Sequence, residues 1–228
     1  MEKLLTAVFG ESCYFCGRVG RLICYGCESH IQVCKSGVCI QCQRETVAGH
    51  THPLCSKESE VKLPSQLCAV YEYGGIVAEV VKKSKYKPKT FALLRLLSFS
   101  GAKMASKLGF DFTGFTVVPV PISKARAQDR GFNQAEIIAR AAGKEFSLVV
   151  NTSILARMRD TTKQFGLHKA ERTHNITGAF AVKGEVAGGK FLLVDDICTT
   201  GSTLMACASA LFAAGACDVK CFTLSRKI

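Results

Sequence analysis

Cysteines spaced two residues apart near the start of the chain constrain the fold more than any other feature. Eight of the 13 cysteines lie in the first 55 residues, and the two-residue gap recurs there. Such a gap lets one turn present two ligands to one metal ion, and Zn²⁺ prefers thiolate and imidazole donors in a tetrahedron. A chance set of buried thiols would not keep producing this gap. The spacing therefore predicts a zinc-binding module.

The candidate ligands divide into two sets of four. The first set is Cys13, Cys16, Cys24 and Cys27, and the second is Cys39, Cys42, His52 and Cys55. We favour this sequential grouping, although spacing alone leaves an interleaved one open. His50 is a rival to His52, and Cys34 is a spare thiol outside both sets. Four protein ligands leave no open position for water, so the sites are predicted to be structural.

The distribution of cysteines also divides the chain. Only five cysteines follow residue 55, which places a boundary near residues 56–66. We expect a zinc-binding module over residues 1–60 and a larger domain over residues 61–228. The short module has few large apolar residues, so metal binding would supply much of its folding energy.

The compartment follows from the same cysteines and from the apolar runs. Residues 1–10 lack the features of a signal peptide, and no apolar run reaches the length of a membrane span. We expect a soluble protein in the reducing cytoplasm, where paired cysteines bind metal instead of forming disulfides.

The positive charge belongs to the larger domain. The net charge is +12, with 7 Lys and Arg against 6 Asp and Glu in residues 1–65, and 23 against 12 thereafter. A positive field favours a phosphorylated ligand, a nucleic acid or both. A lysine-rich surface that serves only solubility would give the same count.

A strand, a tight loop and a helix start are predicted in succession near the C-terminus. The apolar run 191–194 leads into Asp195 and Asp196, and a helical pattern through Leu204, Ala208 and Leu211 follows. Unpaired backbone N–H groups at a helix N-terminus bind anions, and hydroxyls add donors. The two carboxylates suit vicinal ribose hydroxyls. The predicted phosphate ligands are Thr199, Thr200, Gly201, Ser202 and Thr203.

This run resembles a known signature. The chain has neither a P-loop nor a G-x-G-x-x-G motif after a strand, which disfavours an ATPase or a nicotinamide dehydrogenase. Residues 194–203 look like the phosphoribosyl pyrophosphate (PRPP) signature of type I phosphoribosyltransferases. The resemblance implies an α/β fold, a parallel-sheet core with flanking helices.

A second strand is expected at 117–121, followed by a basic segment and an amphipathic helix. Asn133 is a plausible N-cap of this helix, with Glu136 as its reciprocal partner. Ligands sit at the carboxyl ends of strands in an open α/β sheet. Three cations expected there could hold a pyrophosphate, although an exposed basic loop would look the same: Lys124, Arg126 and Arg130.

The combination of these features resembles the ComF family of bacterial competence-associated phosphoribosyltransferase-like proteins. The resemblance extends over essentially the whole chain, through the cysteine pairs, Lys85-Tyr86, Pro119 to Pro121, Arg130 to Gln134, Gln164 to Asn175, and the Asp195 to Gly201 run. It implies a zinc-finger appendage, a role in handling imported DNA, and a helicase-like partner.

Residue roles follow from the resemblance. Asp195 and Asp196 would bind the ribose hydroxyls, and residues 199–203 would surround the 5-phosphate. The segment 157–167, with Arg172 and Asn175, matches a loop that closes over the active site in the wider fold. His52 replaces a cysteine that the family usually has. Cys198 lies beside a helix N-terminus that should lower its pKa, but we favour a small side chain packed under the loop.

Different classes of function remain open. An enzyme would transfer a phosphoribosyl group from PRPP with Mg²⁺ on the diphosphate, although the sequence identifies no acceptor pocket. A binding module would hold single-stranded DNA along the lysines of residues 82–89, with Tyr86 stacking on a base. A zinc module could also dock a helicase-like partner or a second copy of the chain.

Overall fold

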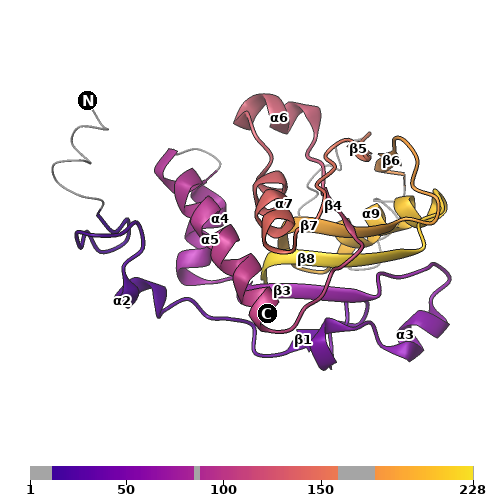
Figure 1. Ribbon diagram of the computed structural model, residues 1–228, viewed down its shortest axis with the longest axis horizontal. Coiled ribbons are helices and arrows are strands. Elements are labelled where there is room, and N and C mark those ends of the chain that lie inside the picture. The colour runs from indigo at the N-terminus through magenta and orange to yellow at the C-terminus, as the bar shows by residue number, and fades with distance from the viewer. Residues whose placement is uncertain (1–11, 85–87, 159–177, 228) are drawn as a thin grey trace, which may run out of the picture.

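The computed structural model describes residues 12–84, 88–158 and 178–227. Within this part of the chain, the central sheet has four parallel strands in the order β3-β8-β7-β4. The strands are β3 (Gln66–Glu72), β4 (Thr116–Pro119), β7 (Lys190–Cys198) and β8 (Asp218–Arg226). Figure 1 shows the sheet at the centre of the molecule, with β7 and β8 side by side.

Both faces of the sheet are covered, as parallel sheets require. Leu192 and Val194 of β7 belong to one core, together with α4 (Gly75–Lys83), α5 (Pro88–Lys107) and α7 (Gln134–Glu145). Phe191 and Leu193 point to the opposite core, which contains the buried face of α9 (Ser202–Ala213). Alternate residues of one strand therefore supply two separate cores. The predicted strands at 117–121 and 191–194 and the predicted buried helix after residue 203 are present.

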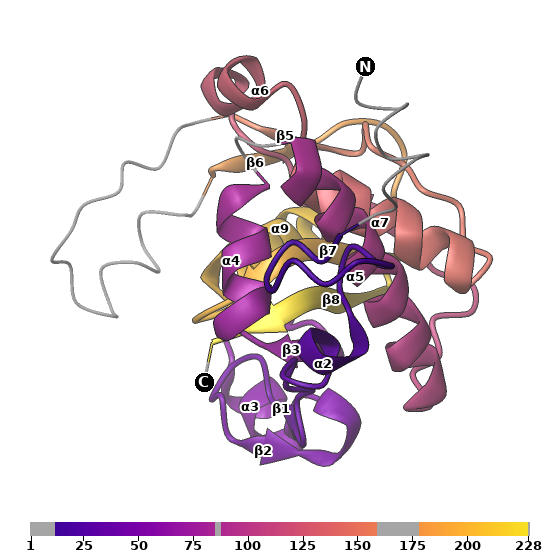
Figure 2. The same ribbon diagram turned by 90° about the vertical axis from the view of Figure 1, so that its left-hand side faces the viewer.

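The cysteine-rich segment lies along the free edge of β3 (Figure 2). It contains α2 (Tyr25–Glu28), β1 (Gly37–Val38), β2 (Glu45–Thr46), the 3-10 helix η1 (Val47–Gly49) and α3 (Pro53–Glu58). Antiparallel bridges join Val33 to Tyr71 and His50 to Gln66. The Cys34 N–H donates to the Val70 carbonyl at 2.9 Å. These bonds satisfy backbone groups that an edge strand would otherwise expose.

Packing also ties this segment to the larger domain. Ile23 is 2% exposed in the core on the α4 and α5 side, whereas Ile40 is 1% exposed in the core on the α9 side. The segment thus contributes one buried isoleucine to each face of the sheet. Packing of these two side chains therefore attaches the segment whether or not its cysteines hold a metal.

The remaining elements lie between β4 and β7 in the sequence. They are α6 (Lys124–Arg130) and the antiparallel pair β5 (Leu155–Arg157) and β6 (Phe180–Val182). Asn133 is the N-cap of α7, as predicted, and its side chain accepts from the Ala135 N–H at 3.1 Å. Glu136 binds Arg140 at 2.6 Å instead of returning to the cap, which corrects the predicted reciprocal partner. The i,i+4 geometry favours this ion pair. No helix within the described ranges is long and apolar enough to cross a membrane.

A close approach between η1 and β3 should make Gly49 indispensable. Gly49 has φ +73°, and a Cβ there would collide with the Leu67 carbonyl. We expect Gly49→Ala to destabilise the protein by more than Gly114→Ala, which has φ +80° and no atom within 4 Å. The control should lose only the left-handed backbone term, about 1–2 kcal/mol. Urea denaturation measures both losses; equal values would show that the collision is relieved without cost.

Candidate functional site

The loop after β7 has the architecture of an anion site. β7 ends at Cys198, Gly201 is the N-cap of α9 with φ +76°, and the helix starts at Ser202. The Thr200 and Ser202 hydroxyls lie 2.6 Å apart, and the Ser202 N–H lies 3.4 Å from the Thr200 oxygen. The N-terminal N–H groups of α9 and its dipole favour negative charge here. Thr199 is exposed, whereas Gly201 is buried.

Asp195 and Asp196 lie where β7 emerges from the core. Residues 191–194 are buried and residues 195–197 are half-buried. Asp195 Oδ1 accepts the Asp196 N–H at 2.9 Å. Strand alternation directs the two carboxylates to opposite faces of β7. A ribose that contacts both carboxylates must therefore lie across the strand end.

Electrostatic neighbours agree with this placement. Burial, followed by the charge of Asp196, raises the pKa of Asp195 well above its usual range, whereas Arg157 acts in the opposite direction. Burial and then the charge of Asp195 raise the pKa of Cys207 on α9. Burial and then Asp196 raise the pKa of Tyr73, which follows β3. One carboxylate thus influences the α9 side and the other the end of β3.

Cys198 is a packed residue under the loop. It is 1% exposed, and burial, with Asp195 next, raises the pKa of its thiol to about 11. The lowered pKa considered from the sequence is wrong because desolvation outweighs the helix N-terminus. The favoured interpretation of a small buried side chain agrees with the structure.

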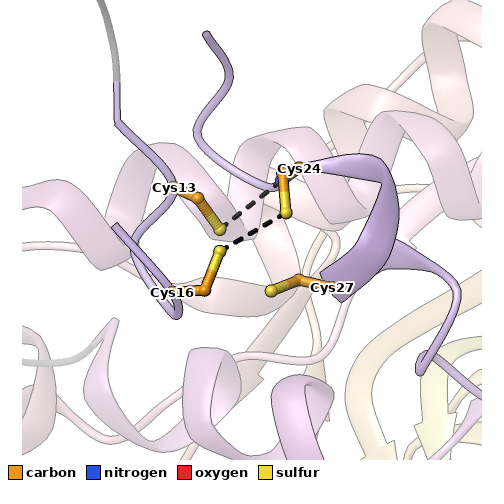
Figure 3. Close-up of side chains that lie close together, drawn as sticks. All are labelled: Cys13, Cys16, Cys24 and Cys27. Atoms are coloured by element: carbon orange, nitrogen blue, oxygen red, sulfur yellow. Dashed lines mark hydrogen bonds between the residues drawn. The ribbon is translucent and has the colours of Figure 1, made fainter. Parts of the chain in front are cut away.

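The first cysteine set forms one compact cluster (Figure 3). The Sγ atoms of Cys13, Cys16, Cys24 and Cys27 all lie within 4.8 Å of one another. Cys16 Sγ is 3.5 Å from Cys24 Sγ, and the Cys24 N–H lies 3.5 Å from Cys13 Sγ. Ligands about 2.3 Å from a tetrahedral ion lie about 3.8 Å apart, so this set fits one ion.

The second cysteine set forms a separate cluster, so the ligands are grouped sequentially, as favoured from the sequence. One ligand atom from each of Cys39, Cys42, His52 and Cys55 lies within 4.8 Å of the others. His52 Nδ1 is 3.2 Å from Cys42 Sγ, and His52 Nε2 is 3.1 Å from the Glu45 carbonyl. A carbonyl partner on the second ring nitrogen is typical of a metal-binding histidine. His50 instead faces Gln66 across a β-bridge.

Backbone donors prepare both clusters for a cation. Burial raises the pKa of Cys13, but N–H groups of Cys24, Cys16 and Phe15 outweigh it and lower the pKa to about 6. The same competition lowers the pKa of Cys39 to about 7. The pKa is thus lowered for Cys13 and Cys24 in the first cluster and for Cys39 in the second. Burial raises the pKa of Cys27 and Cys55, so a bound cation would have to deprotonate these two thiols. The two clusters could hold metal ions.

Several predicted residues cannot be placed. Lys124, Arg126 and Arg130 lie on α6, between β4 and α7, but their side chains are outside the described residues. Lys85, Tyr86, Gln164, Arg172 and Asn175 also lie outside the described residues. The side chains of two lysines in the segment 82–89 are described. Lys83 forms an ion pair with Glu79 at 2.6 Å, and Lys82 Nζ lies 5.8 Å from the Tyr73 ring centre.

Sequence reasoning missed a groove between α5 and α7. The groove has a volume of about 400 Å³ and is lined by Phe91, Arg95, Phe99, Gly131, Phe132, Asn133, Glu136, Ile137 and Arg140. Residues 91, 95 and 99 recur every four positions, which places them on one face of α5. This spacing could have indicated that the three residues share one face of a helix. Only the packing of α7 beside α5 shows that this face lines a groove.

Comparisons with known proteins agree with the fold. A model of the phosphoribosyl transferase domain matches residues 127–228. The chain is 25% identical to competence protein F of Haemophilus influenzae, over 89% of this chain and 96% of that one. It is 26% identical to the DNA utilization protein YhgH of Escherichia coli, over 90% of this chain and 97% of that one. It is 28% identical to competence protein ComFC of Bacillus subtilis, over 90% of this chain and 84% of that one.

The parallel sheet, its flanking helices and the matched domain define a protein with the type I phosphoribosyltransferase fold. The N-terminal cysteine clusters are an addition to that fold. Along nearly its whole length the chain is similar to the competence and DNA utilization proteins named above.

The raised pKa of Asp195 predicts a pH-dependent stability. In the folded state this carboxyl keeps a proton that the unfolded chain releases above about pH 4. The folded state then binds more protons, so stability falls as pH rises. Asp195→Asn removes this titration, so its Tm should exceed that of the wild type at pH 7 and differ less at pH 4.

Asp111→Asn is the control of opposite sign. Hydrogen bonds from the Thr113 side chain and N–H lower the pKa of Asp111, so its contribution is present at neutral pH and lost in acid. This variant should lower the Tm at pH 7. Thermal melts from pH 4 to 8 compare the three proteins. A wild-type pH slope retained in Asp195→Asn would contradict the assignment.

Proposed function

We propose that this protein binds PRPP or a related ribose 5-phosphate and acts in the uptake or processing of transforming DNA. One observation carries the binding proposal: Asp195 and Asp196 end a buried parallel strand, and a hydroxyl-rich loop then opens helix α9. A polar loop at this edge of the sheet is where α/β folds bind ligands. The competence and DNA utilization proteins among the relatives support the role in DNA handling.

The site residues have distinct proposed roles. Asp195 and Asp196 accept hydrogen bonds from the ribose hydroxyls, and Thr199, Thr200, Gly201, Ser202 and Thr203 surround the 5-phosphate. Lys124, Arg126 and Arg130 of α6 follow the carboxyl end of β4, the strand beside β7, and would face the diphosphate. Bound Mg²⁺ would neutralise charge on the diphosphate. As a transferase, the protein would transfer the phosphoribosyl group: the acceptor nucleophile would bond to the ribose C1 as the bond from C1 to diphosphate breaks.

The cysteine clusters are proposed as two structural zinc sites. The thiolate-rich donor sets and their compact geometry suit Zn²⁺, and all four positions of each tetrahedron are supplied by the protein. We retain the division into a zinc module, residues 1–60, and a phosphoribosyltransferase-type domain, residues 61–228. The module is the proposed docking surface for a helicase-like competence partner in the cytoplasm.

Calorimetric titration with PRPP and Mg²⁺ tests the ribose-phosphate site. Wild type should bind, and the double variant Asp195→Asn, Asp196→Asn should bind at least about tenfold more weakly. The loss of one charge-assisted hydrogen bond removes about 1.5–3 kcal/mol, which is enough for this change. Asp218→Asn, at the start of β8, replaces one carboxyl group outside the proposed site and should bind like the wild type. A folded wild type that does not bind PRPP would contradict the proposal.

The α5–α7 groove favours a second function, the binding of single-stranded nucleic acid. Phe99 is 40% exposed, and Phe91 meets Phe132 edge to face at 5.0 Å. Within the described residues, the Arg95 guanidinium forms no hydrogen bond or ion pair, although it lines the same groove. Aromatic faces stack on bases while cations meet the backbone phosphates. None of the residues that line this groove belongs to the cysteine-rich segment, so the strand need not contact the module.

Fluorescence anisotropy with a labelled oligo-dT tests this surface. Phe99→Ala should cost about 1–3 kcal/mol of binding, the value for one stacked base. Arg95→Glu should also weaken binding and reduce its dependence on salt. Lys103→Glu, an exposed residue of the same helix outside the groove, changes the net charge equally. Equal effects of Arg95→Glu and Lys103→Glu would assign binding to net charge alone.

A further inference from the structure

We infer that the second cysteine cluster positions the phosphate loop, so that metal bound by Cys39, Cys42, His52 and Cys55 strengthens phosphate binding at residues 199–203. This inference rests on the proposed function of that loop. It gives the two clusters different roles: the second supports the ligand site, and the first does not.

The contact is between Ile40 and Gly201. Ile40 lies between the ligands Cys39 and Cys42 and is 1% exposed. A Cβ on Gly201 would lie 3.1 Å from Ile40 Cγ1 and 3.4 Å from the Ile40 carbonyl oxygen. A Cβ at position 201 would therefore require Ile40 to move by a few tenths of an ångström. The turn that carries two metal ligands is therefore in direct contact with the N-cap of α9.

Gln43 completes this contact. Its side-chain amide donates to the Ile40 carbonyl at 2.7 Å and lies 3.7 Å from the Cβ position of Gly201. The Gln43 backbone has φ 60°, and its N–H donates to the Cys39 carbonyl at 2.9 Å. The turn is thus closed by its own backbone. A metal on the Cys39 and Cys42 sulfurs would fix the same turn through its side chains.

The turn supports the loop from its buried side. Ile40 shares one core with Cys198 and Leu204, the residues on either side of the loop. Gly201 is buried, whereas Thr199 is exposed and Ser202 and Thr203 are half-buried. The exposed hydroxyls are therefore available to an anion while Gly201 rests on the cysteine turn. A loop held in this way loses less conformational entropy when the anion binds.

The first cluster belongs to the other face of the sheet. Ile23, next to Cys24, is 2% exposed and lies in the core formed with α4, α5 and α7. The three atoms nearest to a Cβ at Gly201 all belong to Ile40 and Gln43, which lie in the second cluster's segment. Ile23 and Ile40 are therefore matched: each is a buried isoleucine beside a cysteine ligand, but only Ile40 contacts the loop.

Coupling between the two sites must be reciprocal. If metal at the second cluster raises the affinity for the phosphate ligand, the ligand raises the affinity for that metal by the same factor. The first cluster should show no such dependence on ligand. This difference between the clusters distinguishes positioning of the phosphate loop by the second cluster from a general stabilisation of the protein by metal.

The first experiment compares Ile40→Ala with Ile23→Ala in the full-length zinc-loaded protein. Calorimetric titration with PRPP and Mg²⁺ should show about tenfold weaker binding for Ile40→Ala, equivalent to about 1.4 kcal/mol. Ile23→Ala should stay close to the wild-type affinity. Equal losses in the two variants, or none in Ile40→Ala, would overturn the inference.

The second experiment removes the metal and reads the loop directly. Cys42→Ser should reduce the zinc content and speed amide hydrogen exchange in residues 199–203. Cys16→Ser should reduce the zinc content while leaving exchange in that loop unchanged. Unchanged exchange in Cys42→Ser after zinc loss would refute the inference. This measurement needs no ligand, so failure of wild type to bind PRPP would count against the proposed function alone.

Discussion

Parallel pairing on both sides of β7 is the constraint on which the rest of the structure depends. β7 lies between β4 and β8, so residues 191–194 are buried and their alternate side chains serve two cores. This burial fixes the point at which the strand emerges. Asp195, Asp196 and the following loop then occupy the carboxyl edge of the sheet, next to the segment that follows β4. The candidate ligand site is thus a consequence of how the central strand is buried.

The burial of Asp195 has a cost that is consistent with function. A carboxyl whose pKa is raised by desolvation and a neighbouring carboxylate is not placed for maximum stability. Such perturbed groups concentrate at functional sites, because a ligand can supply the hydrogen bonds that the protein alone does not. The ribose hydroxyls of the proposed ligand are suitable donors. The position of Asp195 therefore lowers the stability of the folded protein while it favours binding of the proposed ligand.

The cysteine-rich segment is part of the main structure as well as a candidate metal-binding unit. It pairs with the edge of β3 and supplies Ile23 and Ile40 to opposite cores. Gly49 permits the backbone of the segment to approach the Leu67 carbonyl. A metal at the second cluster would therefore act on residues that already contact the proposed ligand loop. A segment joined only by a linker could not influence the loop in this way.

The sequence by itself determined the features that depend on local spacing. The two-residue gaps predicted both ligand sets, the apolar run 191–194 predicted β7, and Asn133 predicted the start of α7. Only the tertiary structure decided the features that depend on distant residues. It excluded His50 from the second cluster, paired Glu136 with Arg140, raised the pKa of Cys198, and seated Ile40 against Gly201. Spacing fixes neighbours within one turn or strand, whereas burial and contact across the sheet arise only when segments far apart in the chain pack together.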